Sequence, residues 1–194
     1  MVKGESVTIK KYDHRYRSKV MRLLYTSWKA HHRHLKHKLS IPDIRRDFNF
    51  YFGTDNPQAF VALSKKGELL GVVFGTLNRK KTKVILTEIG DLFYYSLKFI
   101  GHASSYYKYR LIVAWKTIFG TSTHARLKKP LHYGNVQVVV IPKARSLGVG
   151  TKLLKRYVRH AMVNKVNVLL ATDTIPEGDN HTEAFWTHNG FHVR

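Results

Sequence analysis

Residues 136–154 read VQVVVIPKARSLGVGTKLL and combine three local patterns. The first six residues are nearly all β-branched, which is typical of a buried strand. A turn with Gly148 and Gly150 follows, and apolar residues then recur at helical spacing over about 151–164. The first N–H groups of a helix have no partner inside it, and glycines let an anion approach the backbone. Together with the guanidinium of Arg145, this order of elements predicts a phosphate-binding loop, and an ordinary strand-to-helix turn is the alternative interpretation.

The flanking sequence predicts alternating strands and helices. Periodicity and turn residues indicate a strand at 6–10, helices around 20–28 and from Pro42 to Phe50 or Phe52, a strand at 166–171, and a helix at 182–188 that ends at Asn189-Gly190. Two apolar runs, 59–63 and 69–75, are separated by a short polar loop and predict a β-hairpin.

Composition excludes several classes of protein. The chain has 194 residues, about the length of one domain, and no Cys, so disulfides, thiolate metal sites and Cys nucleophiles are ruled out. The first five residues lack the apolar core of a signal peptide, and no apolar run approaches the ~20 residues that span a bilayer. We therefore expect a soluble, cytoplasmic protein.

The charge is strongly positive. Lys and Arg number 34 against 12 Asp and Glu, which gives a net charge of +22. Residues 1–50 and 79–130 each carry +9, so the excess lies in two segments of the chain. Such a surface attracts polyanions and repels polycations, although high solubility is the simpler interpretation.

Residues 79–130 form a basic, aromatic-rich segment between the hairpin and the strand at 136–141. Two stretches, 92–100 and 106–119, predict amphipathic helices, with Gly101 and Gly120 as breaks. The run Tyr106-Tyr107-Lys108-Tyr109-Arg110 fits base stacking with phosphate contact, and also ordinary helix packing. The segment is open to three interpretations: part of an acceptor cleft, a nucleic-acid contact, or a membrane-surface or dimerisation hairpin.

Two motifs carry a family resemblance. Residues 142–154 resemble the acyl-CoA-binding motif of the GNAT acetyltransferase superfamily, whose core is Q/R-x-x-G-x-G/A, and residues 184–191 resemble its second, aromatic signature. The resemblance implies one α/β (α+β) domain over 1–194, with a mixed, mostly antiparallel central sheet flanked by helices and a helical insertion at 79–130. It also implies an N-acetyltransferase that moves an acetyl group from acetyl-CoA, its cosubstrate, to a primary amine by direct transfer.

The family pattern transfers to particular residues. It implies that backbone N–H groups cradle the CoA pyrophosphate, and these belong to Arg145, Ser146, Leu147, Gly148, Val149, Gly150 and Thr151. The backbone of Val138, Val139 and Val140 would pair with the pantetheine amides like an added strand. For this, either the strand at 166–171, which is the preferred alternative, or a strand starting near Gly190 has to diverge from the central strand. The asparagine that often opens the last helix of the family aligns with Asp179, and the adjacent Asn180 is a further expected cofactor contact.

The chain also departs from the pattern. Ser146 replaces a frequent glycine, Trp186 replaces a tyrosine that can protonate the leaving thiolate, and Gln137 replaces a common acidic residue. Neither an indole nor a carboxamide performs acid–base chemistry at neutral pH. Family members usually continue into two closing strands, whereas three residues follow Phe191. We therefore expect that another segment or a partner chain, for instance a second copy in a homodimer, covers that sheet edge, or that the sequence is truncated.

An attacking amine has to lose a proton, and His132 and Tyr133 are the titratable groups expected nearest to the thioester. A bound water is the alternative base, and Asp173 and Glu177 are candidates for binding the ammonium. The histidines of the 31–37 segment recur every third residue, but no carboxylate assists them, so we expect no metal site.

The charge constrains the acceptor. Polyamines and aminoglycosides should be repelled, whereas an amine on an anionic carrier such as tRNA would be attracted. The alternative function is a nucleic-acid- or ribosome-binding module on a GNAT fold with weak or no catalysis, which the substitutions at 137 and 186 favour.

Overall fold

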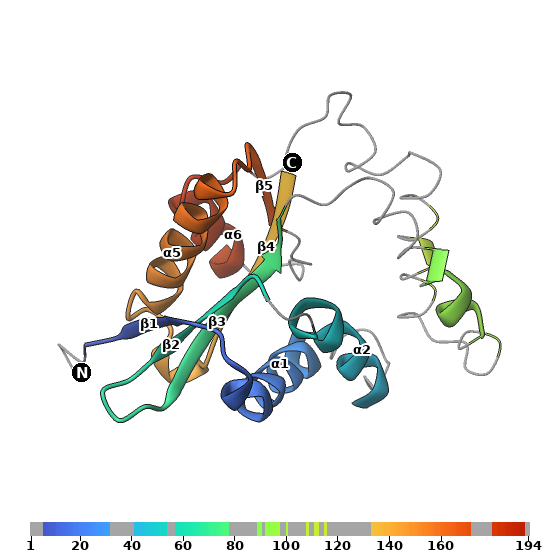
Figure 1. Ribbon diagram of the computed structural model, residues 1–194, viewed down its shortest axis with the longest axis horizontal. Coiled ribbons are helices and arrows are strands. Elements are labelled where there is room, and N and C mark those ends of the chain that lie inside the picture. Colours follow the sequence, from blue (N-terminus) through green and yellow to red (C-terminus); the bar gives the residue numbers. More distant parts are fainter. Residues whose placement is uncertain are drawn as a thin grey trace.

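A five-stranded sheet with the order β1-β2-β3-β4-β5 lies at the centre of the molecule (Figure 1). The computed structural model describes residues 6–31, 41–53, 57–77, 89–90, 92–97, 100, 108, 111–112, 115, 133–171 and 180–192. The strands are β1 (Thr8–Lys11), β2 (Ala59–Leu63), β3 (Leu69–Thr76), β4 (Tyr133–Val140) and β5 (Val168–Ala171). The first four pair antiparallel in sequence order and β5 pairs parallel to β4, which confirms the predicted mixed sheet.

Helices flank the sheet on both sides. They are α1 (Arg17–His31), α2 (Ile41–Phe52), α5 (Val149–Val163) and α6 (Asn180–His188), with short 3-10 turns η1 (His14–Tyr16) and η3 (Pro142–Ala144). Helices α1 and α2 cover one face of the sheet, and α5 covers the other with α6 beside it (Figure 1). The hairpin predicted at 59–63 and 69–75 is confirmed as β2 and β3.

Strand alternation divides the core into two clusters. On β2, Ala59, Val61 and Leu63 face α1 and α2, whereas Phe60 and Ala62 face α5. All five are buried, since helices cover both sides of this strand. Because both faces of β2 are covered, every position of the strand has to be apolar, which explains the continuous apolar run at 59–63.

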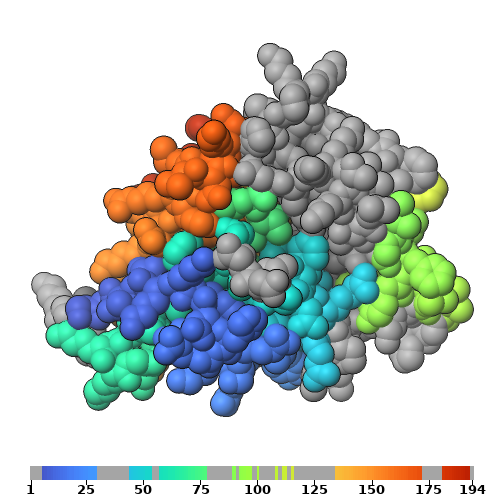
Figure 2. Space-filling model, in the orientation of Figure 1, coloured from blue at the N-terminus to red at the C-terminus, as the bar shows by residue number. Residues whose placement is uncertain are grey.

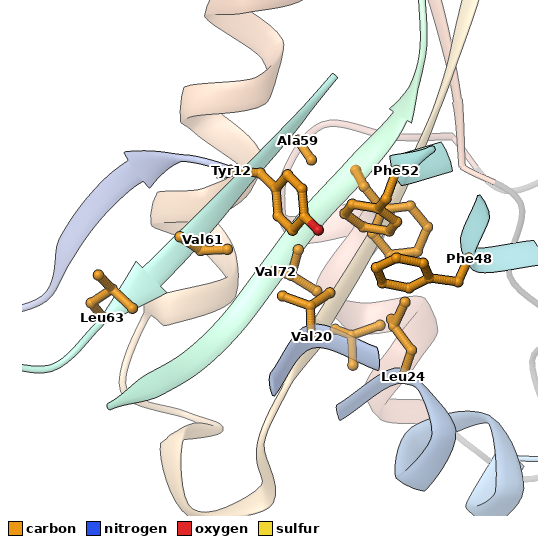
Figure 3. Close-up of a cluster of buried hydrophobic side chains, with 11 residues drawn as sticks. Tyr12, Val20, Leu24, Phe48, Phe52, Ala59, Val61, Leu63 and Val72 are labelled. Carbon is orange, nitrogen blue, oxygen red and sulfur yellow. The ribbon is translucent and has the colours of Figure 1, made fainter. Parts of the chain in front are cut away.

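The cluster beneath α1 and α2 is rich in aromatic rings (Figure 3). Phe48 and Phe52, one helical turn apart on α2, stack with centroids 4.6 Å apart, and the Tyr12 ring lies 4.8 Å from Phe52. Val20 and Leu24 of α1 close the cluster and are fully buried. These contacts fix α2, and with it the residues at its C-terminal end, against the central strands.

The described residues of the 79–130 segment are helical and lie beyond α2 (Figure 1). Tyr95 is completely buried, and the guanidinium of Arg46 on α2 lies 4.4 Å from the ring centroid of Tyr94. The helices predicted at 92–100 and 106–119 fall only partly within the described residues. In the part of the chain that the structure describes, no helix is long and apolar enough to cross a bilayer.

Candidate functional site

The turn between β4 and α5 has the backbone shape of an anion-binding loop. Ser146 and Gly148 adopt left-handed conformations, with φ of 62° and 71°, and the helix begins at Val149. Its first internal hydrogen bond runs from the Lys152 N–H to the Gly148 carbonyl at 3.0 Å. The N–H groups of residues 149–151 therefore precede the first bond of the helix and are the donors that a helix N-terminus offers to an anion.

The amide of Arg145 is not one of these donors. It donates to the Pro142 carbonyl at 3.2 Å and closes the turn of η3. The predicted row of free amides starting at Arg145 is wrong at this first position, because Pro142 sets a 3-10 turn before the loop opens. The Arg145 side chain is exposed and remains available to an anionic ligand.

The two loop glycines serve different purposes. A Cβ added to Gly148 would meet nothing within 4 Å, so this position is open, and its positive φ favours glycine. A Cβ added to Gly150 would lie 3.0 Å from Cε2 of Phe185 and 3.6 Å from Cγ2 of Val140. Gly148 thus leaves room at the loop, whereas Gly150 lets the helix start close to α6 and to the end of β4.

The second part of the site is one edge of β4. Strand β5 pairs with Tyr133 to Val136 and no further, so among the described residues no strand covers positions 137–140 on that side. The strand at 166–171 is expected to diverge from here on, and the residues that follow Ala171 lie outside those that the structure describes. We call the point between Val136 and Gln137 the fork.

The register shows which backbone groups this edge presents. The Ile141 N–H donates to the Leu70 carbonyl of β3 at 3.0 Å, and hydrogen-bonded positions alternate along an antiparallel pair. Val139 accordingly bonds β3, whereas the N–H and C=O groups of Val138 and Val140 point to the open side. Of the three valines predicted to hold pantetheine, only these two present backbone groups to a ligand.

Polar side chains gather at the fork on the α2 side. The amide nitrogens of Asn135 and Gln137 lie 3.4 and 3.5 Å from the Tyr51 hydroxyl, at the end of α2. The Asn135 carboxamide oxygen also accepts from Thr76, from its N–H at 2.6 Å and its hydroxyl at 2.8 Å. Sequence reasoning missed Tyr51, since it lies 84 residues from Asn135 and reads as one more aromatic of an apolar helix face.

A buried tyrosine supports the fork from the α5 side. The Tyr157 hydroxyl donates to the Asn135 backbone carbonyl at 3.1 Å. Burial, with a smaller contribution from nearby Tyr51, raises the pKa of Tyr157 far above its usual value. This phenol therefore stays protonated at neutral pH and acts as a fixed donor.

The structure does not describe the side chains of several residues that the sequence singled out for the site. His132 lies outside the described residues, as do His34 and His37. Tyr133 is the first residue of β4, opposite Val168, and Asn180 is the first residue of α6, but their side chains are not described. Within the described part of the chain, no cluster of His, Cys, Asp or Glu is arranged to hold a metal.

Trp186, at the position of the family tyrosine, is a core residue. It is 4% exposed, and its ring lies 4.9 Å from Phe191 and 5.1 Å from Phe185. Its backbone carbonyl accepts from the Phe191 N–H at 3.0 Å. The second aromatic signature therefore holds α6 and the following turn together.

The electrostatic setting favours an anionic ligand. From Leu92 to Thr172 the sequence contains 14 Lys and Arg and no Asp or Glu. The glycine loop and all of α5 lie inside this range. An ion pair of Lys143 with Glu68 at 3.2 Å brings one carboxylate to the neighbouring surface, where both side chains are exposed.

The site can hold a long, partly anionic molecule. Amide donors at the helix start suit a diphosphate, and the edge of β4 suits an arm with amide groups of its own. A Cβ added to Gly150 would lie only 3.6 Å from Cγ2 of Val140, so the start of α5 adjoins the end of the β4 edge.

Comparisons with known proteins agree with this geometry. The model of the acetyltransferase (GNAT) family matches residues 19–191. No curated protein sequence matches the chain. A putative acetyl transferase from Pyrococcus furiosus has a TM-score of 0.59 at 15% identity, covering 97% of this chain and 95% of that one.

Two further solved structures share the fold. An aminoglycoside N-acetyltransferase AAC(6')-Iy in complex with CoA has a TM-score of 0.54 at 12% identity and covers 100% and 92% of the two chains. Glucosamine-6-phosphate N-acetyltransferase from Arabidopsis thaliana has a TM-score of 0.52 at 11% identity, with coverages of 98% and 94%. With the family model spanning most of the sequence, these findings establish that the chain belongs to the GNAT acetyltransferase family.

Proposed function

We propose that this chain transfers an acetyl group from acetyl-CoA to a primary amine in one direct step. The observation that carries the proposal is the open edge of β4 at Val138 and Val140, which runs into the N-terminus of α5. The family assignment and the N-acetyltransferases of the same fold support it.

The loop would hold the diphosphate end of the cosubstrate. The N–H groups of residues 149–151 precede the first helical bond, and the helix dipole adds partial positive charge at the same place. Gly148 leaves its side open, and the exposed Arg145 is within the same turn. Together these groups would neutralise a diphosphate without a metal-binding cluster of carboxylates.

The edge of β4 would set the direction of the pantetheine arm. From Val140 back to Val136 the strand advances about 13 Å, at roughly 3.3 Å per residue. An arm bonded to Val138 and Val140 would bring the thioester to the fork, beside Gln137. The thioester supplies the activated acetyl group, and backbone N–H groups near the fork would stabilise the oxyanion as the amine attacks.

The proton of the amine has to leave by a group other than Gln137, because a carboxamide is not a base. We assign this step to His132 or Tyr133, which precede the fork, or to a water held there. Tyr51 is placed to orient the acceptor, since Asn135 and Gln137 hold its hydroxyl at the fork.

The acceptor we propose is an amine carried on an anionic molecule such as tRNA. The acid-free range from Leu92 to Thr172 would attract such a carrier and repel free polycations. Aminoglycosides, the substrates named for two similar folds, are poor acceptors on this argument.

A pair of variants at Gly148 tests cosubstrate binding. Gly148→Glu and Gly148→Gln place side chains of similar size at the same left-handed position, so both carry the same backbone strain. Only the carboxylate repels a diphosphate, so calorimetry should show the Glu variant binding CoA at least tenfold more weakly than the Gln variant. Equal affinities for the two variants would contradict the loop assignment.

An acceptor screen by mass spectrometry, with aminoacyl-tRNA among the amines, tests the reaction. A nucleic-acid-binding module without catalysis is the second candidate, favoured by the buried Trp186 and by Gln137 on the central strand. It predicts no heat with acetyl-CoA at millimolar concentration, together with RNA binding that falls steeply with salt.

A further inference from the structure

The described residues of the 79–130 segment expose an apolar stripe. Ile89, Phe93, Leu97 and Ile100 follow one another at intervals of four, four and three residues, so they share one face of a helical segment. Phe93 is 70% exposed and Ile100 is 82% exposed. The inward side is fixed by buried Tyr95 and by the contact of Tyr94 with Arg46, so the stripe faces away from the core.

A second run of helical residues extends this surface. Ile112 and Trp115 are also exposed, and together with Leu92, Ser96 and Leu111 they line a wide, open hollow of about 490 Å³. Six of the nine large exposed hydrophobic residues described in the chain therefore belong to this one segment. Figure 2 shows its described residues, in yellow-green, at the end of the molecule beyond α2.

The charge of the segment limits what can cover the stripe. Residues 79–130 contain 11 Lys and Arg against two acidic residues, Glu88 and Asp91. A second copy of the chain would bring another strongly positive segment against the first, which is unfavourable. A nucleic acid would satisfy the charge and could stack on Phe93 and Trp115, but it would leave the aliphatic side chains of Ile89, Leu97, Ile100 and Ile112 without an apolar partner.

We propose that this stripe is a peripheral membrane-binding surface for bilayers that contain anionic phospholipids. Exposed Phe, Leu, Ile and Trp side chains would enter the region between headgroups and acyl chains, and the positive charge that the sequence gives this segment would favour anionic headgroups. The proposal is independent of the acetyltransferase reaction, because the residues that carry it lie outside the loop, the β4 edge and the fork.

Vesicle co-sedimentation of the full chain tests it. We expect binding to vesicles of phosphatidylcholine with phosphatidylglycerol and at least tenfold weaker binding to phosphatidylcholine alone. Phe93→Ser with Ile100→Ser should reduce binding about tenfold for each lost side chain, the value expected from burial of a large apolar residue. The matched control is Met162→Ser with Val163→Ser, whose side chains are 67% and 82% exposed at the end of α5 and should not matter.

Tryptophan emission gives a second measurement. Trp115 is 56% exposed, so its emission should move to shorter wavelength on anionic vesicles, and Trp115→Phe should remove the shift while sedimentation persists. If the Phe93→Ser, Ile100→Ser variant does not fold, the emission shift of Trp115 in the unmodified chain tests whether this surface binds the vesicles. Several outcomes overturn the proposal: no binding to anionic vesicles, equal binding by the stripe and control variants, or a stripe-dependent dimer or RNA complex without membrane binding.

Discussion

Two residues that flank helix α5 have a strained, left-handed backbone, and replacing each of them by glycine tests how much this strain costs. Ser146 precedes it with φ of 62°, and Lys165 follows it with φ of 58°. A left-handed conformation costs an L-residue with a Cβ about 1–2 kcal/mol. Glycine avoids that cost, although it loses about 0.5–1 kcal/mol more conformational freedom on folding. We therefore expect Ser146→Gly and Lys165→Gly each to raise the free energy of unfolding by about 0.5–1 kcal/mol.

Lys165 is a suitable reference because its role is purely local. Its N–H donates to the Met162 carbonyl at 2.9 Å and the Val166 N–H donates to the Ala161 carbonyl at 3.0 Å. These are the two bonds of a Schellman motif, in which glycine is the usual residue at the left-handed position. Neither bond involves the lysine side chain.

Urea denaturation measures both effects. The midpoint should rise while the slope m stays unchanged, because the buried area is the same. The two positions are separated by the 15 residues of α5, about 22 Å at 1.5 Å per residue, so their effects should add in the double variant. Stabilisation by Lys165→Gly together with destabilisation by Ser146→Gly would contradict this prediction. The Ser146 side chain would then add more to the free energy of unfolding than its left-handed backbone subtracts.

Three further predictions concern the site and its surroundings. Val138→Pro removes an N–H that faces the open side and should abolish CoA binding while the protein stays folded. Val139→Pro removes a hydrogen bond to β3 and should unfold the protein. Circular dichroism measures folding and calorimetry measures CoA binding, so the two effects can be distinguished. Tyr51→Phe should raise KM for the amine and leave CoA affinity unchanged; a change in CoA affinity alone would place Tyr51 away from the acceptor. Burial, with smaller contributions from Lys11 and Arg156, lowers the pKa of His160, whose ring hydrogen-bonds the Gln58 side chain. The unfolded state then binds more protons, so stability should fall as the pH drops below the ordinary His pKa of about 6.5, and His160→Gln should flatten that dependence in urea titrations at several pH values.

Local patterns predicted the elements that hold the site. The glycine loop was predictable, since left-handed turns and helix starts depend on a few adjacent residues. Helix α5 begins at Val149, about two residues before the periodicity suggested, because the left-handed Gly148 already ends the turn. Strand β4 begins at Tyr133. Gly134 pairs with Leu169 of β5, and Asn135 pairs with both β5 and β3, despite the low strand propensity of both residue types.

Other features of the site depend on contacts between distant segments. The register with β3 decides which valines present their backbone groups to the open side of β4. A shift of one residue would exchange the orientations of Val138 and Val139. The chemistry of the fork is non-local as well, since Tyr51 reaches Asn135 and Gln137 only through the packing of α2. Sequence patterns carry no signal for either relationship.

The two sequence motifs that suggested the family also contact each other in space. Phe185, from the aromatic signature, occupies the space that a side chain at Gly150 would need. Trp186 and Phe191 pack behind it and fix the end of α6. The aromatic signature thus holds the start of α5 at the end of the β4 edge, where both halves of the site must meet. The indole of Trp186 therefore supports the loop by filling a core position, whatever its part in the proposed chemistry.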